Sequence, residues 1–141
     1  MSLSKKFRLK KELKSVTSDL ASLNVELAEQ MILLASQTGD CAPLISAVNA
    51  LRQAQEIYSS DTVPHKHAQV QKALGDTLLT LGRANDDIDA LDACVQAYRS
   101  AITLASMLGD EEMRMESKLN YAVARRLLES RVGTLDMRGA A

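Results

Sequence analysis

Apolar residues recur at intervals of three and four along most of the chain. The clearest series lies on one face of a helix with about 3.6 residues per turn and consists of Val70, Ala73, Leu74, Leu78 and Leu81. Two further series have the same spacing: Ala47, Leu51, Ala54 and Ile57, and Cys94, Tyr98, Ala101 and Leu104. This pattern predicts amphipathic helices whose apolar stripes form the core.

Residues that end or begin helices separate these stripes. Gly39 and Gly109 are suited to left-handed C-terminal caps, and an aspartate that can cap the next helix follows each of them. Pro64 stands at a tolerated first-turn position, with Thr62 or Asp61 just before it. Each of these separators therefore predicts a boundary between two helices.

Gly82 and the polar run 85–87 break the chain once more. With six Gly, two Pro and four aromatic residues, the composition also favours helices over an all-β sandwich. We therefore expect an all-α fold of about five helices, near residues 4–37, 42–60, 64–82, 87–108 and 111–131, with a tail from Gly133.

Shifting the sequence by 47 residues aligns it with itself. Segment 47–54 then falls on segment 94–101, with Arg52 on Arg99 and small or apolar residues on residues of the same kind. At the same offset, Leu27, Ala28 and Met31 fall on Leu74, Gly75 and Leu78. An offset of 49 gives a third half-unit with Val123, Ala124 and Leu127. The chain is thus predicted to repeat a pair of helices.

The repeated pattern resembles the tetratricopeptide repeat over about residues 20–130. The small residue after the first large one in Leu27-Ala28, Leu74-Gly75 and Val123-Ala124 carries the likeness, because antiparallel helices approach closely where side chains are small. The chain departs from the family in lacking its usual Trp and Pro and in a unit of 47 residues, where the family has about 34. HEAT-like and armadillo-like helix pairs share the longer period, but the small residues favour the tetratricopeptide interpretation.

The resemblance implies an α-solenoid of antiparallel helix pairs with a long N-terminal helix. Its expected parts are a basic N-terminal segment 1–19, a repeat domain 20–131 with units 20–66, 67–113 and 114–131, and a flexible C-terminal tail 132–141.

The resemblance also implies a function, namely a non-catalytic scaffold that binds a peptide or helix of another protein in a concave groove. The first helices of the units would line this groove. By the motif, its residues would be Val25, Glu29, Ile32, Gln69, Lys72, Asp76, Leu79, Tyr121, Arg125 and Leu128. The recurrent Lys and Asn pairs with which chaperone-binding members hold a terminal carboxylate are missing, which disfavours that class of partner.

The formal net charge of −1 conceals an uneven distribution. Residues 1–19 hold six basic and two acidic groups, and the remaining residues hold 11 basic and 16 acidic groups. The basic arm consists of Lys5, Lys6, Arg8, Lys10, Lys11 and Lys14. It could contact nucleic acid, an anionic membrane surface or an acidic protein, although a solvated helix end is the simpler interpretation.

The first helix carries a series with alternating spacings of three and four: Leu13, Val16, Leu20, Leu23, Leu27 and Leu34, with Gln30 at the one polar position. The simpler interpretation is an amphipathic helix packed on its own repeats. In the alternative, residues 9–23 project beyond the body and pair with a second copy. The protein would then be a dimeric helical adaptor or regulator whose basic arm makes the functional contact.

The chain offers little material for catalysis or metal binding. His65 and His67 point to different faces of a helix, and the aspartates at 86, 87, 89 and 92 fit helix capping better than a calcium loop. Cys94 occupies a small-residue packing position and is expected to be an inert buried thiol. We therefore expect no enzyme activity, no cofactor and no metal.

Two features bear on localisation. The longest unbroken apolar run, 31–35, is far below the roughly 18 residues that cross a bilayer. Cys41 and Cys94 lack a close cysteine partner and metal-type spacing, which favours reduced thiols, with one disulfide as the alternative. We expect a cytoplasmic protein.

Overall fold

The fold is all-α. A computed structural model describes residues 2–58 and 63–140. In this part of the chain, five helices account for the regular structure: α1 (Leu3–Thr38), α2 (Ala42–Ile57), α3 (Pro64–Asn85), α4 (Ile88–Leu108) and α5 (Glu111–Ala140). The predicted fold class and helix number are confirmed.

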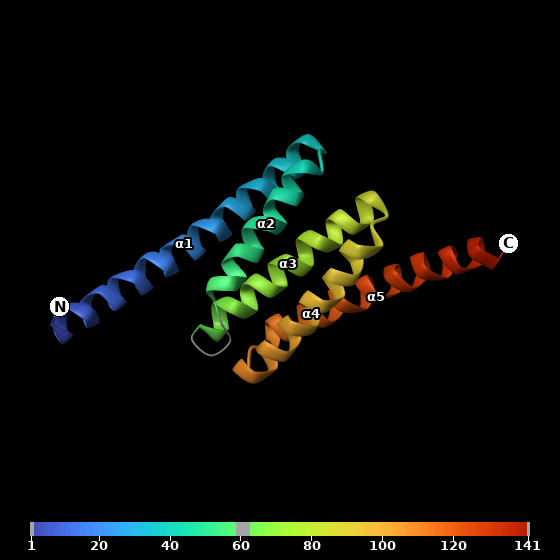
Figure 1. Cartoon of the computed structure of the whole chain (residues 1–141). Helices are drawn as coiled ribbons and strands as arrows, with labels where there is room; N and C mark the ends of the chain where they lie inside the picture. Colours follow the sequence, from blue (N-terminus) through green and yellow to red (C-terminus); the bar gives the residue numbers. More distant parts are fainter. Residues whose placement is uncertain (1, 59–62, 141) are drawn as a thin grey trace.

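Consecutive helices pack side by side in alternating directions (Figure 1). The main contacts are between α1 and α2, between α3 and α4, and between α4 and α5, while α2 against α3 joins the first hairpin to the rest. As a result α1, α3 and α5 run in the same direction (Figure 1). The backbones of these three parallel helices make few contacts with one another. Whether the space between two of them is filled therefore depends on the side chains that face it.

The predicted apolar stripes form the core. Val70, Leu74, Leu78 and Leu81 of α3 are buried, as are Leu51 of α2 and its neighbouring alanines. In α4, the stripe of Cys94, Tyr98, Ala101 and Leu104 is buried over its whole length. The spacing of apolar residues therefore identified the inward faces of α2, α3 and α4.

Several helix ends are also confirmed. Gly39 and Gly109 have φ angles of 74° and 72°, in the left-handed region that glycine adopts without strain. Pro64 begins α3. The carboxylates of Asp87 and Asp110 accept hydrogen bonds from the backbone N–H groups of α4 and α5, at Ala90 and Met113. The suggested caps Asp61 and Thr62 lie outside the described residues.

Three predicted boundaries differ from the structure. Gly82 does not end α3, which continues to Asn85, because this glycine serves helix packing: a Cβ atom on it would lie 2.7 Å from the Leu91 side chain of α4. The last helix passes through Gly133 and continues to Ala140, where the sequence predicted a tail. The helix α2 ends at Ile57 instead of near residue 60.

The long helix α1 packs through a face that the sequence prediction overlooked. Ala21, Ala28 and Ala35, seven residues apart, are its buried residues. Small side chains at this spacing let α2 approach α1 closely along its length. The series Leu13, Val16, Leu20, Leu23, Leu27 and Leu34, named the leucine stripe below, is 43–67% exposed. The first helix therefore packs on the rest of the chain, as the simpler interpretation expects, but not through the leucine stripe.

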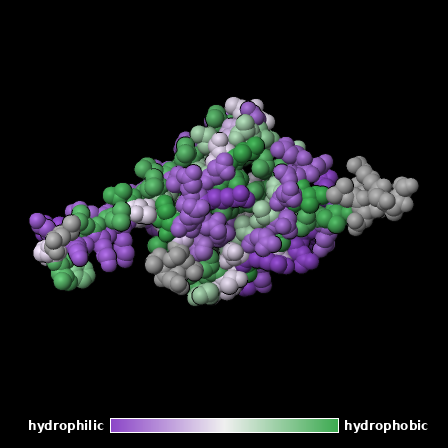
Figure 2. Space-filling view, viewed as in Figure 1, coloured by the Kyte–Doolittle hydropathy of each residue, from purple (hydrophilic) through white to green (hydrophobic). Residues whose placement is uncertain are grey.

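The N-terminal part of α1 extends away from the other helices (Figure 1). All residues from Ser2 to Val16 are exposed, whereas Ala21 is fully buried and the Ser22 and Tyr58 hydroxyls lie 3.1 Å apart. The projecting part therefore ends near residue 17 and not at residue 23, as the sequence suggested. In Figure 2, hydrophobic residues follow the outer edge where α1 runs, beside a largely hydrophilic central face.

A helix that crosses a membrane must be long and apolar. Within residues 2–58 and 63–140, none of the helices combines sufficient length and apolarity.

Candidate functional site

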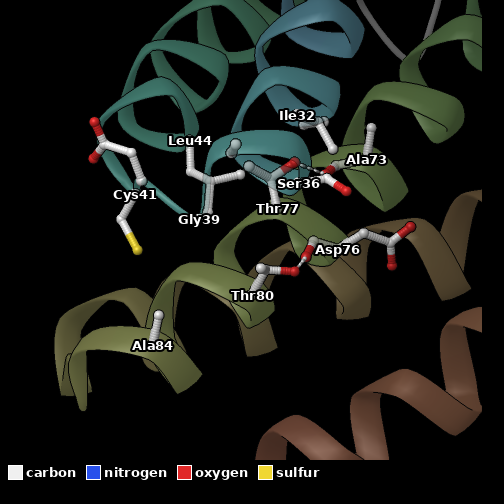
Figure 3. A pocket seen from close by; sticks show the side chains of 12 residues that line it. Ile32, Ser36, Gly39, Cys41, Leu44, Ala73, Asp76, Thr77, Thr80 and Ala84 are labelled. Atoms are coloured by element: carbon white, nitrogen blue, oxygen red, sulfur yellow. Dashed lines mark hydrogen bonds between the residues drawn. The ribbon is translucent and has the colours of Figure 1, made fainter.

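Two hollows lie between the parallel helices α1 and α3. The larger has a volume of about 580 Å³ and is lined by Ile32, Ser36, Leu44, Ala73, Thr77 and Thr80, among others (Figure 3). The second, of about 450 Å³, is lined by residues that include Val25, Glu29, Tyr58, Gln69 and Val70. Ala73 belongs to both, so the hollows adjoin. Together they are named the α1/α3 groove.

Short side chains keep this groove unfilled. Ser36 of α1 faces Ala73 and Thr77 of α3 across it (Figure 3), and Ala35 also belongs to the lining. None of these four side chains is long enough to span the distance between two helix axes. Because α3 packs mainly on α2 and α4 instead, α1 and α3 diverge and leave an accessible apolar floor.

Carboxylates surround this floor. Asp40 and Asp76 line the larger hollow, and Glu26 and Glu29 line the second one. The cationic side chain in the lining is Lys66, whose ammonium lies 5.6 Å from the centre of the Tyr58 ring. The groove thus combines an apolar floor with an excess of negative charge.

The next junction, between α3 and α5, is bridged by polar side chains. Lys72 Nζ of α3 lies 3.1 Å from Asp76 Oδ2 and 3.4 Å from Glu116 Oε2 of α5. Asn120 Nδ2 of α5 donates to Asp76 Oδ1 at 3.2 Å, and the Tyr98 hydroxyl of α4 donates to the same oxygen. These five residues, named the polar cluster, connect three helices.

The protonation states fit these roles. Burial opposes the charge on Lys72, but the carboxylates of Asp76 and Glu116 outweigh it and raise the pKa of this ammonium. Burial, and then the hydrogen bond to Asp76, raise the pKa of Tyr98. At neutral pH the lysine is therefore charged and the phenol is a neutral donor, as the cluster requires.

The groove residues expected from the motif fall into two groups. Val25, Glu29, Ile32, Gln69 and Asp76 line the α1/α3 groove.

The second group lies elsewhere: Lys72 belongs to the polar cluster, and Leu79, Tyr121 and Leu128 pack half-buried against the core. Arg125 is exposed, pairs with Glu129 at 3.1 Å, and lies with Arg99 over the Tyr121 ring. The structure therefore does not bring these five together with the groove, because α5 is tied to α3 and α4.

Sequence reasoning missed Ser36, Ala73 and Thr80 as groove residues. Ser36 and Thr80 follow the predicted Ile32 and Asp76 by four positions, which places them on the same helix faces one turn further on. Extending the predicted faces by one turn would have found them. The polar cluster leaves no comparable signal, because its members become neighbours only through the packing of α3, α4 and α5.

The basic arm and the histidines occupy separate places. All six basic residues of the arm are exposed, and five of them precede Leu13, where α1 reaches a further hollow of about 560 Å³ with Ile57 and Tyr58. The side chains of His65 and His67 each bond a glutamine one turn further along α3. Burial lowers the pKa of His67. Among the described residues, no group of three or more His, Cys, Asp or Glu could hold a metal ion.

Cys94 is buried in the α3–α4 contact. Its thiol donates to the Gly75 carbonyl oxygen at 3.2 Å. Burial, assisted by the charge of Asp76, raises the pKa of this thiol to about 12. It is therefore a protonated packing group at neutral pH.

Comparisons of the chain with protein-family models, curated protein sequences and solved structures found no match.

Proposed function

We propose that this protein is a non-catalytic interaction module that binds a helix or peptide segment of a partner protein in the α1/α3 groove. The observation that carries the proposal is the groove itself: about 580 Å³ of hollow at its larger end, with an apolar floor accessible to solvent. Binding sites for ligand segments are typically such concave, largely apolar surfaces with a few polar groups around them.

The charges around the groove define the partner segment. Three carboxylates in its lining, those of Glu26, Glu29 and Asp40, outnumber Lys66, while the carboxylate of Asp76 is already paired with Lys72. Electrostatic complementarity favours a segment that places apolar side chains on the floor and Lys or Arg side chains beside the carboxylates. An acidic segment would meet like charge on both sides.

The stagger of the parallel helices supports a repeat architecture similar to the tetratricopeptide repeat. Across the α3/α5 junction, Lys72 pairs with Glu116 and Asp76 with Asn120, in each case 44 positions apart. The small residues of the three aligned positions, Ala28, Gly75 and Ala124, are all buried.

We further propose that the protein acts in the cytoplasm. Its two cysteines are free thiols, which fits a reducing compartment.

A selection from a library of helical peptides, with the intact chain as target, tests the proposed function. Enriched peptides are expected to carry apolar residues at helical spacing together with Lys or Arg. The double variant Ser36→Arg/Thr80→Arg fills the groove and largely neutralises its negative charge, so it should weaken the binding of these peptides at least about tenfold.

The chain offers a matched control on α4. Thr103→Arg/Ser106→Arg also changes an exposed threonine and an exposed serine, and Thr103, like Thr80, donates its hydroxyl to the carbonyl four residues earlier. This variant should bind like the wild type. Peptides that bind both double variants equally, or a selection that enriches acidic peptides, would contradict the proposed function.

A further inference from the structure

We propose that the leucine stripe of α1 pairs with the same stripe of a second copy of this chain, in a parallel, in-register two-helix coiled coil. The leucine stripe shares no residue with the lining of the α1/α3 groove, Glu26 lies between the two surfaces, and the inference goes beyond the proposed function. It assigns an occupant to the one helix face that is both strongly apolar and exposed along α1.

The stripe has the pattern of a coiled-coil seam. With Leu9, which is also exposed, it runs from residue 9 to residue 34 with strictly alternating spacings of four and three. It therefore spans more than three heptads, or about 38 Å of helix. Apolar heptads sustained over this length are typical of a helix that pairs with another helix.

The stripe remains accessible while α1 is packed on α2. Leu20, Leu27 and Leu34 directly precede the buried alanines 21, 28 and 35, so the two faces lie about 100° apart around the helix. A second helix can therefore lie along the stripe beside α2 without displacing it.

Gln30 identifies the occupant and the register. It takes the place of an apolar residue in the seam, and its side chain is exposed. In a parallel, in-register pair it meets its own counterpart, and the two amides can donate to and accept from each other. In an antiparallel pair centred on the same seam it would face Leu13, which offers its amide no partner.

The charges beside the seam also favour the parallel arrangement. Glu12, Asp19 and Glu26 follow one another at intervals of seven along one flank of the stripe. An antiparallel pair would place this acidic row against the same row of the second copy. A parallel pair places it against the opposite flank, where Thr17 and Asn24 carry no charge.

A parallel pair brings the two basic arms together at one end. Lys5 of one copy then lies beside Lys10 of the other, and the remaining arm cations are doubled. Mutual repulsion of these cations opposes pairing and is screened by salt. Self-association should therefore become tighter as the salt concentration rises, and Lys5→Gln/Lys10→Gln should reduce this dependence.

Sedimentation equilibrium of the intact chain at micromolar concentrations tests the pairing. The expected mass is twice the 15.4 kDa of one chain. Leu20→Glu/Leu27→Glu should raise the dissociation constant at least about a hundredfold, because it places charge at two seam positions. Met107→Glu/Leu119→Glu, which changes exposed apolar residues of α4 and α5, should leave it unchanged.

All four positions are exposed, so each variant is expected to fold. Circular dichroism checks this. A monomeric wild type, or a stripe variant that dimerises like the wild type, would overturn the proposal. Neither result tests the groove, which is probed by peptide binding. The groove variant Ser36→Arg/Thr80→Arg is expected to leave the sedimentation mass unchanged.

Cysteine cross-linking tests the orientation. In a Cys41→Ser background, Gln30→Cys should form a disulfide-linked dimer under mild oxidation, because the two positions face each other. In a mixture with a differently tagged Leu13→Cys chain, each variant should link only to itself. Linkage between position 13 of one chain and position 30 of the other would show an antiparallel pair and would overturn the parallel assignment.

Discussion

The two junctions between parallel helices, α3/α5 and α1/α3, are built from the same kind of helix pair, but side chains bridge the first and leave the second open. Between α3 and α5, Lys72, Asp76, Glu116 and Asn120 reach across and bond. Between α1 and α3, alanines and hydroxyl residues face each other over a hollow. The polar groups of the α3/α5 junction are thus paired within the chain, whereas the α1/α3 junction has an apolar floor bordered by the carboxylates of Glu26 and Glu29.

Both the backbone and the side chains contribute to this difference. The α3 and α5 backbones approach each other more closely than those of α1 and α3, and Asp76 and Asn120 bond across the α3/α5 junction. Long polar side chains fill the α3/α5 junction, whereas the short side chains of the α1/α3 junction leave its surface accessible to a ligand. Asp76 belongs to both junctions, because it accepts a hydrogen bond from Asn120 of α5 and also lines the groove toward α1.

The largest effect is expected from Tyr98→Ala. The Tyr98 ring is fully buried, and its hydroxyl supplies the polar cluster with a donor. Its removal should lower the free energy of unfolding by about 3–5 kcal/mol. Tyr121→Ala on the half-buried face of α5 should cost about 1 kcal/mol or less. Urea denaturation followed by circular dichroism measures both, and similar losses would refute the role given to Tyr98.

Gly75→Ala tests how the Tyr98 ring reaches the cluster. A Cβ atom at Gly75 would lie 2.6 Å from a carbon of this ring, so the ring must move. Overpacking of this kind should cost about 1–3 kcal/mol of unfolding free energy. At Gly133 in α5, a Cβ atom would meet nothing within 4 Å. Gly133→Ala should therefore stabilise by up to about 1 kcal/mol, and a stabilising Gly75→Ala would contradict the packing described.

Asp76→Asn compares the two junctions directly. It removes the charge that holds Lys72 and accepts from Asn120, and it should cost about 1–2 kcal/mol in thermal or urea unfolding. Asp40→Asn, on the groove side, keeps the oxygen that accepts from the Ala42 N–H and should stay within about 0.5 kcal/mol of the wild type. Equal losses would mean that both junctions contribute alike to stability.

The last prediction concerns the reactivity of the two thiols and not the stability of the fold. Cys41 lines the groove, and Cys94 is buried with its pKa raised to about 12. Near pH 8, such a thiol is ionised about a thousandfold less than a free thiol with a pKa of about 8.5. Labelling with a chromogenic disulfide should therefore show one reacting thiol, assigned to Cys41 by Cys41→Ser. Fast labelling of Cys94 in the folded chain would contradict its burial.

Local signals in the sequence predicted the helices well. Gly39, Gly109 and Pro64 act through their own backbone preferences, so their effects are visible without tertiary structure. Gly82 has the opposite role. Its neighbour Leu91 belongs to the next helix, and only the packed structure shows that the glycine is there for contact.

The candidate site was predictable in part. The resemblance to the repeat motif placed Val25, Ile32 and Asp76 on the predicted groove, and these three residues line the α1/α3 groove. The helical period could not separate the two faces of α1, because the leucine stripe and the alanine row both repeat every seven residues. Which of them α2 covers depends on how closely the helices approach, and alanines allow the closer contact.

The most direct test of the account is a methyl NMR titration of the intact chain with a peptide enriched in the library selection. The account predicts that the largest shifts occur at Ile32 and Ala73 on the groove floor, whereas Met113 at the α3/α5 junction and Leu23 of the leucine stripe stay in place. Largest shifts at Met113 or at Leu23 would contradict the claim that the α1/α3 groove is the binding surface.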